Sequence, residues 1–193
     1  MNYSDELKVV WITPMRTGTR SSYALMKKLN FSNLSHEIRV PEGKENYFIV
    51  MNIRNPYSRL VSLYNMFKFS QQNMEYEFES WIKKEHFILK DNVHDIFLSN
   101  RIKNLKTPPS HFVKMESFVE DILSLQFVKN NLELLKNEID QNILQNRYSY
   151  DYVPSGTQKK FWKDYYNSEL AELIQKKMYR EFEYFGYDLN SWK

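Results

Sequence analysis

A polar stretch near the start of the chain, TPMRTGTRSS from Thr13 to Ser22, has the residue types of a phosphate-binding loop. It follows the apolar run KVVWI and precedes the helix-like YALMKKL, an order that predicts strand, loop and helix. Backbone N–H groups at a helix start attract anions, and Arg16 adds a cation two residues before the loop's glycine, Gly18. Hydroxyl groups for further phosphate contacts come from Thr17, Thr19, Ser21 and Ser22.

A second polar motif, RNPYSRLVSLY, follows the strongest strand candidate, YFIVMNI. Arg54 comes directly after that strand, and Ser62 lies eight residues later in the predicted helix. The guanidinium of Arg54 offers a fork of donors to a phosphate, and Ser62 offers a hydroxyl. In an open parallel sheet, ligands bind at the carboxyl ends of the strands, where both motifs are expected. The two motifs together predict a ligand with two separate anionic groups.

Short apolar and β-branched runs predict the strands that position these motifs. The strand candidates are Lys8–Thr13, His36–Val40, Tyr47–Ile53 and His111–Met115. Helices are expected at Thr19–Leu29, from Pro56 with Asn55 as N-cap, in ESFVEDILSL, and at Tyr166–Phe185. Helical segments with loops are expected over residues 75–106, and a long loop over residues 140–162. The alternation predicts an α/β fold, with one domain over residues 1–193 and a mostly parallel central sheet flanked by helices.

Composition restricts the class of protein. The chain has 193 residues, 42% of them hydrophobic and 26% charged, which fits one soluble globular domain. The absence of cysteine excludes disulfides, a thiol nucleophile and cysteine-bound metals. The net charge of +3 and the lack of a basic stripe do not favour nucleic acid as a partner. No apolar run approaches the ~20 residues that cross a bilayer, and MNYSDELK lacks the features of a signal peptide, so we expect a cytoplasmic protein.

A nucleotide triphosphatase with a P-loop is the first alternative. Such a loop ends in Gly-Lys-Ser/Thr, whereas here no lysine adjoins Gly18. The strand ends carry Thr13, Arg54 and Met115 in place of an acidic magnesium ligand, although Glu116 follows Met115. The loop therefore suits a nucleotide phosphate that is held without a metal ion.

The first motif resembles that of the sulfotransferases that use 3′-phosphoadenosine 5′-phosphosulfate (PAPS). In that family the first strand is followed by Pro, a Lys or Arg, a Ser or Thr, Gly and further hydroxyl residues, which grip the 5′-phosphosulfate. The matching residues here are Pro14, Arg16, Thr17, Gly18 and Thr19. Arg20 stands where many members have a second Ser or Thr, so it either contacts a phosphate or points away. The resemblance implies that Arg16 stabilises charge on the leaving phosphate, and that 3′-phosphoadenosine 5′-phosphate (PAP) is the product.

The second motif is similar to the family's 3′-phosphate site, with Arg54-Asn55-Pro56 followed by Ser62. RLVSLY looks most like the carbohydrate-sulfotransferase branch, and so does the tail from Ser155 to Asp188, where a basic loop borders the nucleotide. HFVKMESFVED is similar to a strand and acidic helix of that branch. The resemblance implies that Lys159 or Lys160 adds a cation for the 3′-phosphate. It also implies transfer of a sulfuryl group to an acceptor hydroxyl or amine, with a carbohydrate favoured as acceptor.

The acceptor's proton requires a base. Family members with a histidine base place it between the two phosphate motifs, and His36 is the histidine in that window. His94, in DNVHDIF, is the second candidate because the middle segment is expected near the acceptor. The remaining candidates are His86, His111, Glu37, Glu85 and Asp95. A non-catalytic nucleotide-binding module of the same fold stays open as a further alternative, and the sequence does not decide the acceptor or the oligomeric state.

Overall fold

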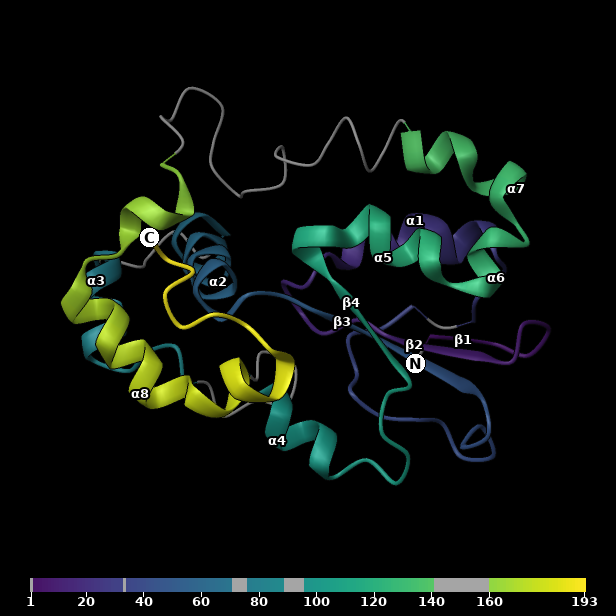
Figure 1. Cartoon of the computed structure of the whole chain (residues 1–193), viewed down its shortest axis with the longest axis horizontal. Coiled ribbons are helices and arrows are strands. Elements are labelled where there is room, and N and C mark those ends of the chain that lie inside the picture. Colours follow the sequence, from purple (N-terminus) through teal and green to yellow (C-terminus); the bar gives the residue numbers. More distant parts are fainter. Residues whose placement is uncertain (1, 33, 71–75, 89–95, 141–159) are drawn as a thin grey trace. The chain divides into compact units, whose positions relative to one another are not determined.

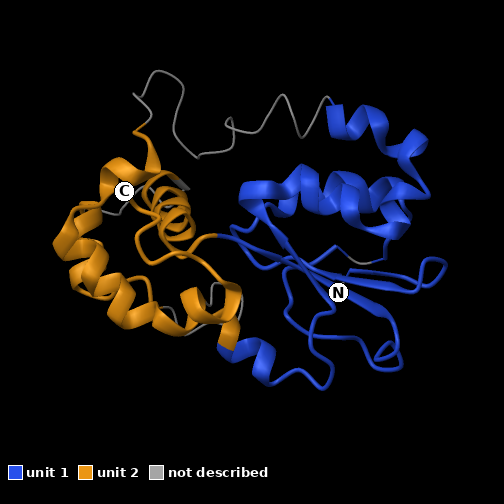
Figure 2. Ribbon diagram, viewed as in Figure 1, with its two compact units in different colours: residues 1–54, 100–149 blue, residues 55–99, 150–193 orange. Residues whose placement is uncertain are grey.

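The computed structural model describes residues 2–32, 34–70, 76–88, 96–140 and 160–193. The chain divides into two compact units (Figure 2). Unit 1 comprises residues 1–54 and 100–149, and unit 2 comprises residues 55–99 and 150–193. Each unit has its own hydrophobic core, and the expectation of one domain over residues 1–193 stays a prediction.

Unit 1 is built on a four-stranded sheet in the order β1-β2-β3-β4 (Figure 1). The strands are β1 (Tyr3–Ser4), β2 (Val9–Ile12), β3 (Phe48–Ile53) and β4 (His111–Lys114). β2, β3 and β4 are parallel, and β1 runs antiparallel to β2. All four residues of β2 and five of the six in β3 are buried, as the apolar runs predict. The α/β fold class and the mostly parallel sheet are therefore confirmed.

Helices of unit 1 cover one face of this sheet (Figure 1). They are α1 (Thr19–Lys28), α5 (Phe118–Ser124), α6 (Gln126–Lys129) and α7 (Leu132–Asn137), with the 3-10 helix η1 (Met115–Ser117) before α5. Trp11 of β2 lies fully buried at the centre of the core, edge-on to Phe31 and Phe127 at ring-centroid distances of 6.2 and 5.8 Å. This aromatic packing attaches the sheet to α6 and to the segment that follows α1.

The carboxyl ends of the three parallel strands share one edge of the sheet. Ile12 of β2 pairs with Met51 of β3, and Ile53 of β3 pairs with Lys114 of β4. The chain segments that begin at Thr13, Arg54 and Met115 therefore leave the sheet at the same edge, as expected for a parallel sheet with a ligand site.

Unit 2 consists of helices around an aromatic core. Its elements are α2 (Pro56–Ser70), α3 (Phe78–Lys83), the 3-10 helix η3 (Trp162–Tyr165) and α8 (Ser168–Phe185), and α4 (Leu98–Lys103) begins in it. Asn55 Oδ1 accepts a hydrogen bond from the N–H of Tyr57 at 3.0 Å, which confirms the predicted cap of α2. The Tyr166 hydroxyl donates to the carbonyl of Tyr57 at 2.8 Å, so the start of α2 is tied to the segment before α8.

A buried carboxylate joins α8 to the start of α4. Glu181 is 2% exposed, and its Oε1 accepts hydrogen bonds from both the N–H of Ser99 at 2.9 Å and the Ser99 hydroxyl. Burial raises the pKa of Glu181, an effect that the Ser99 donors and the charge of Arg59 oppose only in part. Within the described residues, none of the helices combines the length and hydropathy that crossing a bilayer requires.

One predicted strand is wrong. Residues 36–40 form no strand, although Ile38 is buried as the pattern suggested. Just before them, both backbone polar groups of Ser35 bond to the Asn2 side chain, so at this residue a side chain takes the place of a neighbouring strand. The short strand β1, which contains no apolar run, was not predicted.

Candidate functional site

The loop between β2 and α1 has a tightly folded backbone. Arg16 and Gly18 both have left-handed backbone conformations, with φ of 67° and 87°. The N–H of Thr17 donates to the carbonyl of Pro14 at 3.3 Å, and Gly18 is the N-cap of α1. A non-glycine residue at positive φ is uncommon and strained, and such residues gather at ligand sites. The loop thus leads into the start of α1, where the first N–H groups and the partial positive charge of the helix dipole suit an anion.

Gly18 fits a position that no other residue could occupy without rearrangement. A Cβ atom there would lie 2.4 Å from Sδ of Met115, the first residue after β4. The loop therefore lies directly against the end of β4, and a glycine is needed both for its φ and for this close approach.

Asn52 attaches the loop to the sheet, and it belongs to neither polar motif of the sequence. This fully buried residue of β3 donates from Nδ2 to the carbonyl of Thr17 at 3.0 Å and to Oγ of Ser22 at 2.6 Å. Its Oδ1 accepts from Nε1 of Trp11 at 2.8 Å. The available signal was a lone amide in an otherwise apolar strand, YFIVMNI, since a buried polar group requires hydrogen-bond partners.

The loop hydroxyls divide into two groups. Thr17 and Thr19 both donate their hydroxyl hydrogens to the carbonyl of Pro14, at 2.6 and 3.1 Å. These two threonines therefore shape the loop from inside, and any contact with a phosphate would require their hydroxyl hydrogens to turn outward. Ser21 and Arg16 are half-buried, and Arg20 is exposed. In this conformation the donors that suit an anion are the Arg16 guanidinium, the Ser21 hydroxyl and the first N–H groups of α1.

Arg54 and Ser62 fall in different units. Arg54 is half-buried at the end of β3, on the same sheet edge as the loop that contains Gly18. Ser62 is buried in unit 2, on the second turn of α2. Unit 1 therefore brings the first motif and Arg54 to one edge, while Ser62 is positioned by α2.

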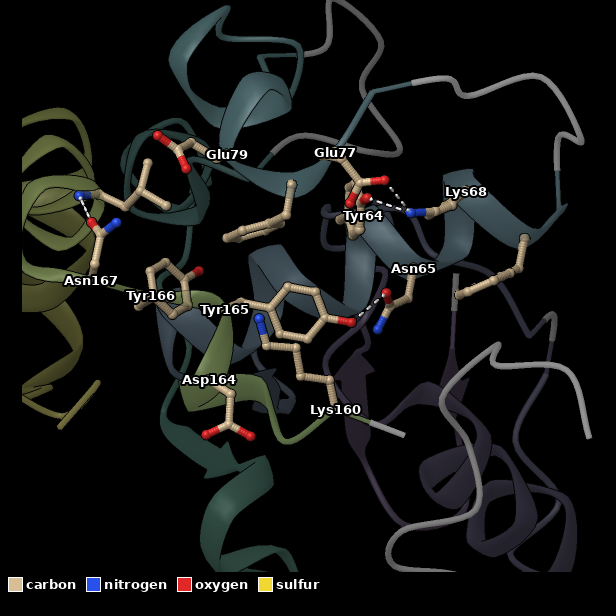
Figure 3. Close-up of a pocket in the computed structure, with 13 residues that line it drawn as sticks. Tyr64, Asn65, Lys68, Glu77, Glu79, Lys160, Asp164, Tyr165, Tyr166 and Asn167 are labelled. Atoms are coloured by element: carbon tan, nitrogen blue, oxygen red, sulfur yellow. Dashed lines mark hydrogen bonds and ion pairs between the residues drawn. The ribbon is translucent and has the colours of Figure 1, made fainter. Parts of the chain in front are cut away.

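Lys160 lines a pocket of about 460 Å³ in unit 2 (Figure 3). Its Nζ lies 4.8 Å from the centre of the Tyr165 ring, and the Tyr165 hydroxyl donates to Oδ1 of Asn65 at 3.3 Å. Tyr165 therefore links Lys160 to α2, the helix that also carries Ser62.

The rest of this pocket carries charges of both signs. Lys68 donates to Glu77 at 3.2 Å and to the Tyr64 hydroxyl at 3.1 Å, as the dashed lines of Figure 3 show. Glu79 and Asp164 add two further carboxylates. These acidic side chains would repel phosphate, so Lys160 and not the whole pocket is the suitable anion contact.

His36 is the candidate base that lies beside the phosphate loop. Its Nδ1 lies 3.2 Å from the carbonyl oxygen of Thr13, the residue before Pro14. His86 stacks on Tyr76 in unit 2 with ring centroids 4.5 Å apart. The Nε2 of His111, at the start of β4, is buried without a hydrogen-bond partner among the described residues. The candidates His94 and Lys159 lie outside the described residues.

These groups would suit a phosphate ester bound next to a histidine. The loop, Arg16 and Arg54 supply donors and positive charge along one sheet edge, and His36 adjoins the first residue of the loop. Charge-assisted hydrogen bonds of this kind hold phosphates more strongly than neutral donors do.

Comparison with known proteins identifies a family over most of the chain. A family model described as the sulfotransferase family matches residues 14–188, from the proline of the first loop to the segment after α8. No curated protein and no solved structure matches the chain.

Proposed function

The chain belongs to the sulfotransferase family, and from that membership we propose that it transfers a sulfuryl group from PAPS to a hydroxyl or amine of a carbohydrate. The family makes the protein a PAPS-dependent transferase. The choice of a carbohydrate acceptor rests on the resemblance of RLVSLY and of the tail to the carbohydrate branch.

One observation carries the proposal, namely the left-handed loop around Gly18 that lies on the same sheet edge as Arg54. PAPS carries a phosphosulfate at its 5′ end and a phosphate at its 3′ end, so it needs two anion sites. The N–H groups of α1, together with Arg16, suit the first anion, and Arg54 suits the second. The absent Cβ of Gly18 lets the loop backbone pack directly against Met115 at the end of β4, which fixes the loop on this edge.

Sulfuryl transfer forms a bond from the acceptor oxygen or nitrogen to sulfur and breaks the bond from sulfur to the phosphate oxygen. The leaving phosphate keeps the electron pair and gains negative charge. By analogy with phosphoryl transfer, positioning and charge stabilisation dominate the catalysis. Arg16 has an electrostatic role in this scheme, because a guanidinium does not release its proton at ordinary pH.

The acceptor's proton passes to His36. The Thr13 carbonyl accepts from Nδ1 of this histidine, which leaves Nε2 as the basic nitrogen of the neutral ring. For the 3′-phosphate, Arg54 is the proposed contact in unit 1. Ser62 and Lys160 of unit 2 stay predictions that rest on the family resemblance.

The direct test is transfer of labelled sulfate from PAPS across a panel of saccharides and other hydroxyl or amine compounds. We expect transfer to a saccharide, and expect Arg16→Ala to lower turnover ~100-fold or more, the usual cost of losing one oxyanion donor. Lys27→Ala, which removes an exposed cation from the last turn of α1, is the matched control and should retain turnover. Wild-type turnover in the Arg16→Ala protein would contradict the role of this residue.

Nucleotide preference separates this function from that of a kinase. PAP should raise the melting temperature in the absence of magnesium, because the proposed site holds phosphate through N–H groups and arginine. Stabilisation by ATP with magnesium, and none by PAP, would favour the kinase alternative.

A further inference from the structure

Asn2 makes an unusual set of contacts next to the candidate base. Its side chain is 2% exposed, and Oδ1 accepts from the N–H of Ser35 at 2.6 Å. Nδ2 lies within donating distance of three oxygens, namely those of the Trp11 carbonyl, the Thr13 hydroxyl and the Ser35 carbonyl, at 2.8, 3.1 and 3.0 Å. One amide thus joins both backbone polar groups of Ser35 to the last residues of β2 and to Thr13.

His36 follows Ser35 directly, and its ring lies beside the Thr13 carbonyl. The Thr13 carbonyl can only accept a hydrogen bond, so the Nδ1 atom 3.2 Å away carries the hydrogen. The Tyr23 ring of α1 packs on the imidazole, with centroids 5.9 Å apart and planes 31° apart. Backbone and ring are therefore both fixed relative to the loop that begins at Pro14.

We propose that Asn2 is a positioning residue for His36, which holds the histidine in the tautomer with hydrogen on Nδ1 and the lone pair on Nε2. It acts through Ser35, whose N–H and carbonyl it binds, so that the following imidazole reaches the Thr13 carbonyl. The catalytic consequence rests on the proposed function, in which Nε2 of His36 accepts the acceptor's proton. The tautomer itself is a property of the protein without any ligand.

Nuclear magnetic resonance of protein with ¹⁵N-labelled histidine tests the tautomer directly. The His36 signals are identified by their loss in His36→Gln. At a pH where His36 is neutral, we expect Nδ1 to carry the hydrogen in the wild type, and the ring nitrogens to move toward an averaged mixture in Asn2→Ala. Asn131→Ala removes another amide hydrogen bond of unit 1, to the Phe127 carbonyl, and should leave the His36 signals unchanged. Hydrogen on Nε2 in the wild type, or an unchanged tautomer in Asn2→Ala, would overturn the proposal.

Turnover measured with the best acceptor from the panel tests the consequence. General base catalysis contributes about 10²–10⁴-fold, so His36→Gln should lose that factor and Asn2→Ala a part of it, about 10-fold. In the Asn2→Ala/His36→Gln double variant, the Asn2 substitution should have no additional effect, because its action passes through the histidine. An additional loss in the double variant would mean that Asn2 acts elsewhere.

Two outcomes separate this inference from the proposed function. Full turnover in His36→Gln removes the histidine as base, while the tautomer measurement still decides the role of Asn2. Full turnover in Asn2→Ala, with His36→Gln impaired, refutes only the positioning role. If Asn2→Ala does not fold, Asn2→Asp serves instead, because it keeps the acceptor for the Ser35 N–H and lacks the amide donors.

Discussion

Replacing Asn52 with alanine is expected to destabilise unit 1 and to loosen the phosphate loop at the same time. The substitution removes all three hydrogen bonds of the buried amide and leaves Nε1 of Trp11 and the carbonyl of Thr17 without these partners. Each buried polar group left unsatisfied costs about 1–3 kcal/mol, so we expect the two groups to lower the free energy of unfolding by about 2–6 kcal/mol. For a chain of this size that corresponds to a fall in melting temperature of about 4–24 °C.

The loosening of the phosphate loop in Asn52→Ala is measured through its effect on PAP binding. A ligand at a hundredfold excess over its dissociation constant stabilises the folded state by about 2.7 kcal/mol, and a hundredfold weaker affinity reduces this gain to about 0.4 kcal/mol. We therefore expect the PAP-induced rise in melting temperature to be large in the wild type and nearly absent in Asn52→Ala. Calorimetry with and without PAP measures both effects in one set of samples.

A matched variant separates the loop from general destabilisation. Ser22→Ala removes only one of the three partners of Asn52 and leaves its bond to the Thr17 carbonyl, so it should cost about 1 kcal/mol and retain most of the PAP response. If Asn52→Ala melts lower than the wild type but shows the same PAP-induced shift, the idea that Asn52 holds the loop for the nucleotide is wrong.

Three further predictions concern the loop and α8. Gly18→Ala should lower the free energy of unfolding by about 1–2 kcal/mol because of the left-handed backbone at this position alone, and it should weaken PAP binding because Met115 must also move. Calorimetry and PAP titration measure the two effects, and unchanged values would contradict the close approach of Gly18 to Met115. Arg16→Gly should be more stable than Arg16→Ala by about 1 kcal/mol, because glycine adopts the positive φ of this position without strain. Both variants should lose turnover, and equal denaturation midpoints would contradict backbone strain at residue 16. The raised pKa of Glu181 means that the folded protein binds its proton more tightly than the unfolded chain does, so this group's contribution to stability falls as pH rises from about 4.5 through the folded pKa. Melting curves of Glu181→Gln should lack this fall and lie above those of the wild type at neutral pH, and parallel pH profiles for the two proteins would refute it.

The sequence by itself determined the elements whose signals are local. Short apolar and β-branched runs predicted β2, β3 and β4, and α2 begins at Pro56 behind its Asn55 cap as predicted. The order of strands and polar motifs along the sequence also predicted that both motifs follow strand ends. Because the carboxyl ends of parallel strands lie at one edge of a sheet, these ends were expected to lie together. The family match over residues 14–188 is consistent with those motifs. The roles of the individual site residues stay predictions.

The tertiary structure alone decided how the loop and the candidate base are held. Asn52 reaches the loop at Thr17 from another strand, and Asn2 reaches Ser35 from the start of the chain. Ser35 lies just before residues 36–40, where the predicted strand is absent, and its backbone carbonyl bonds to a side chain far away in sequence. Propensity and periodicity describe a residue's nearest neighbours, whereas a buried amide finds its partners only when the folded chain brings distant segments together.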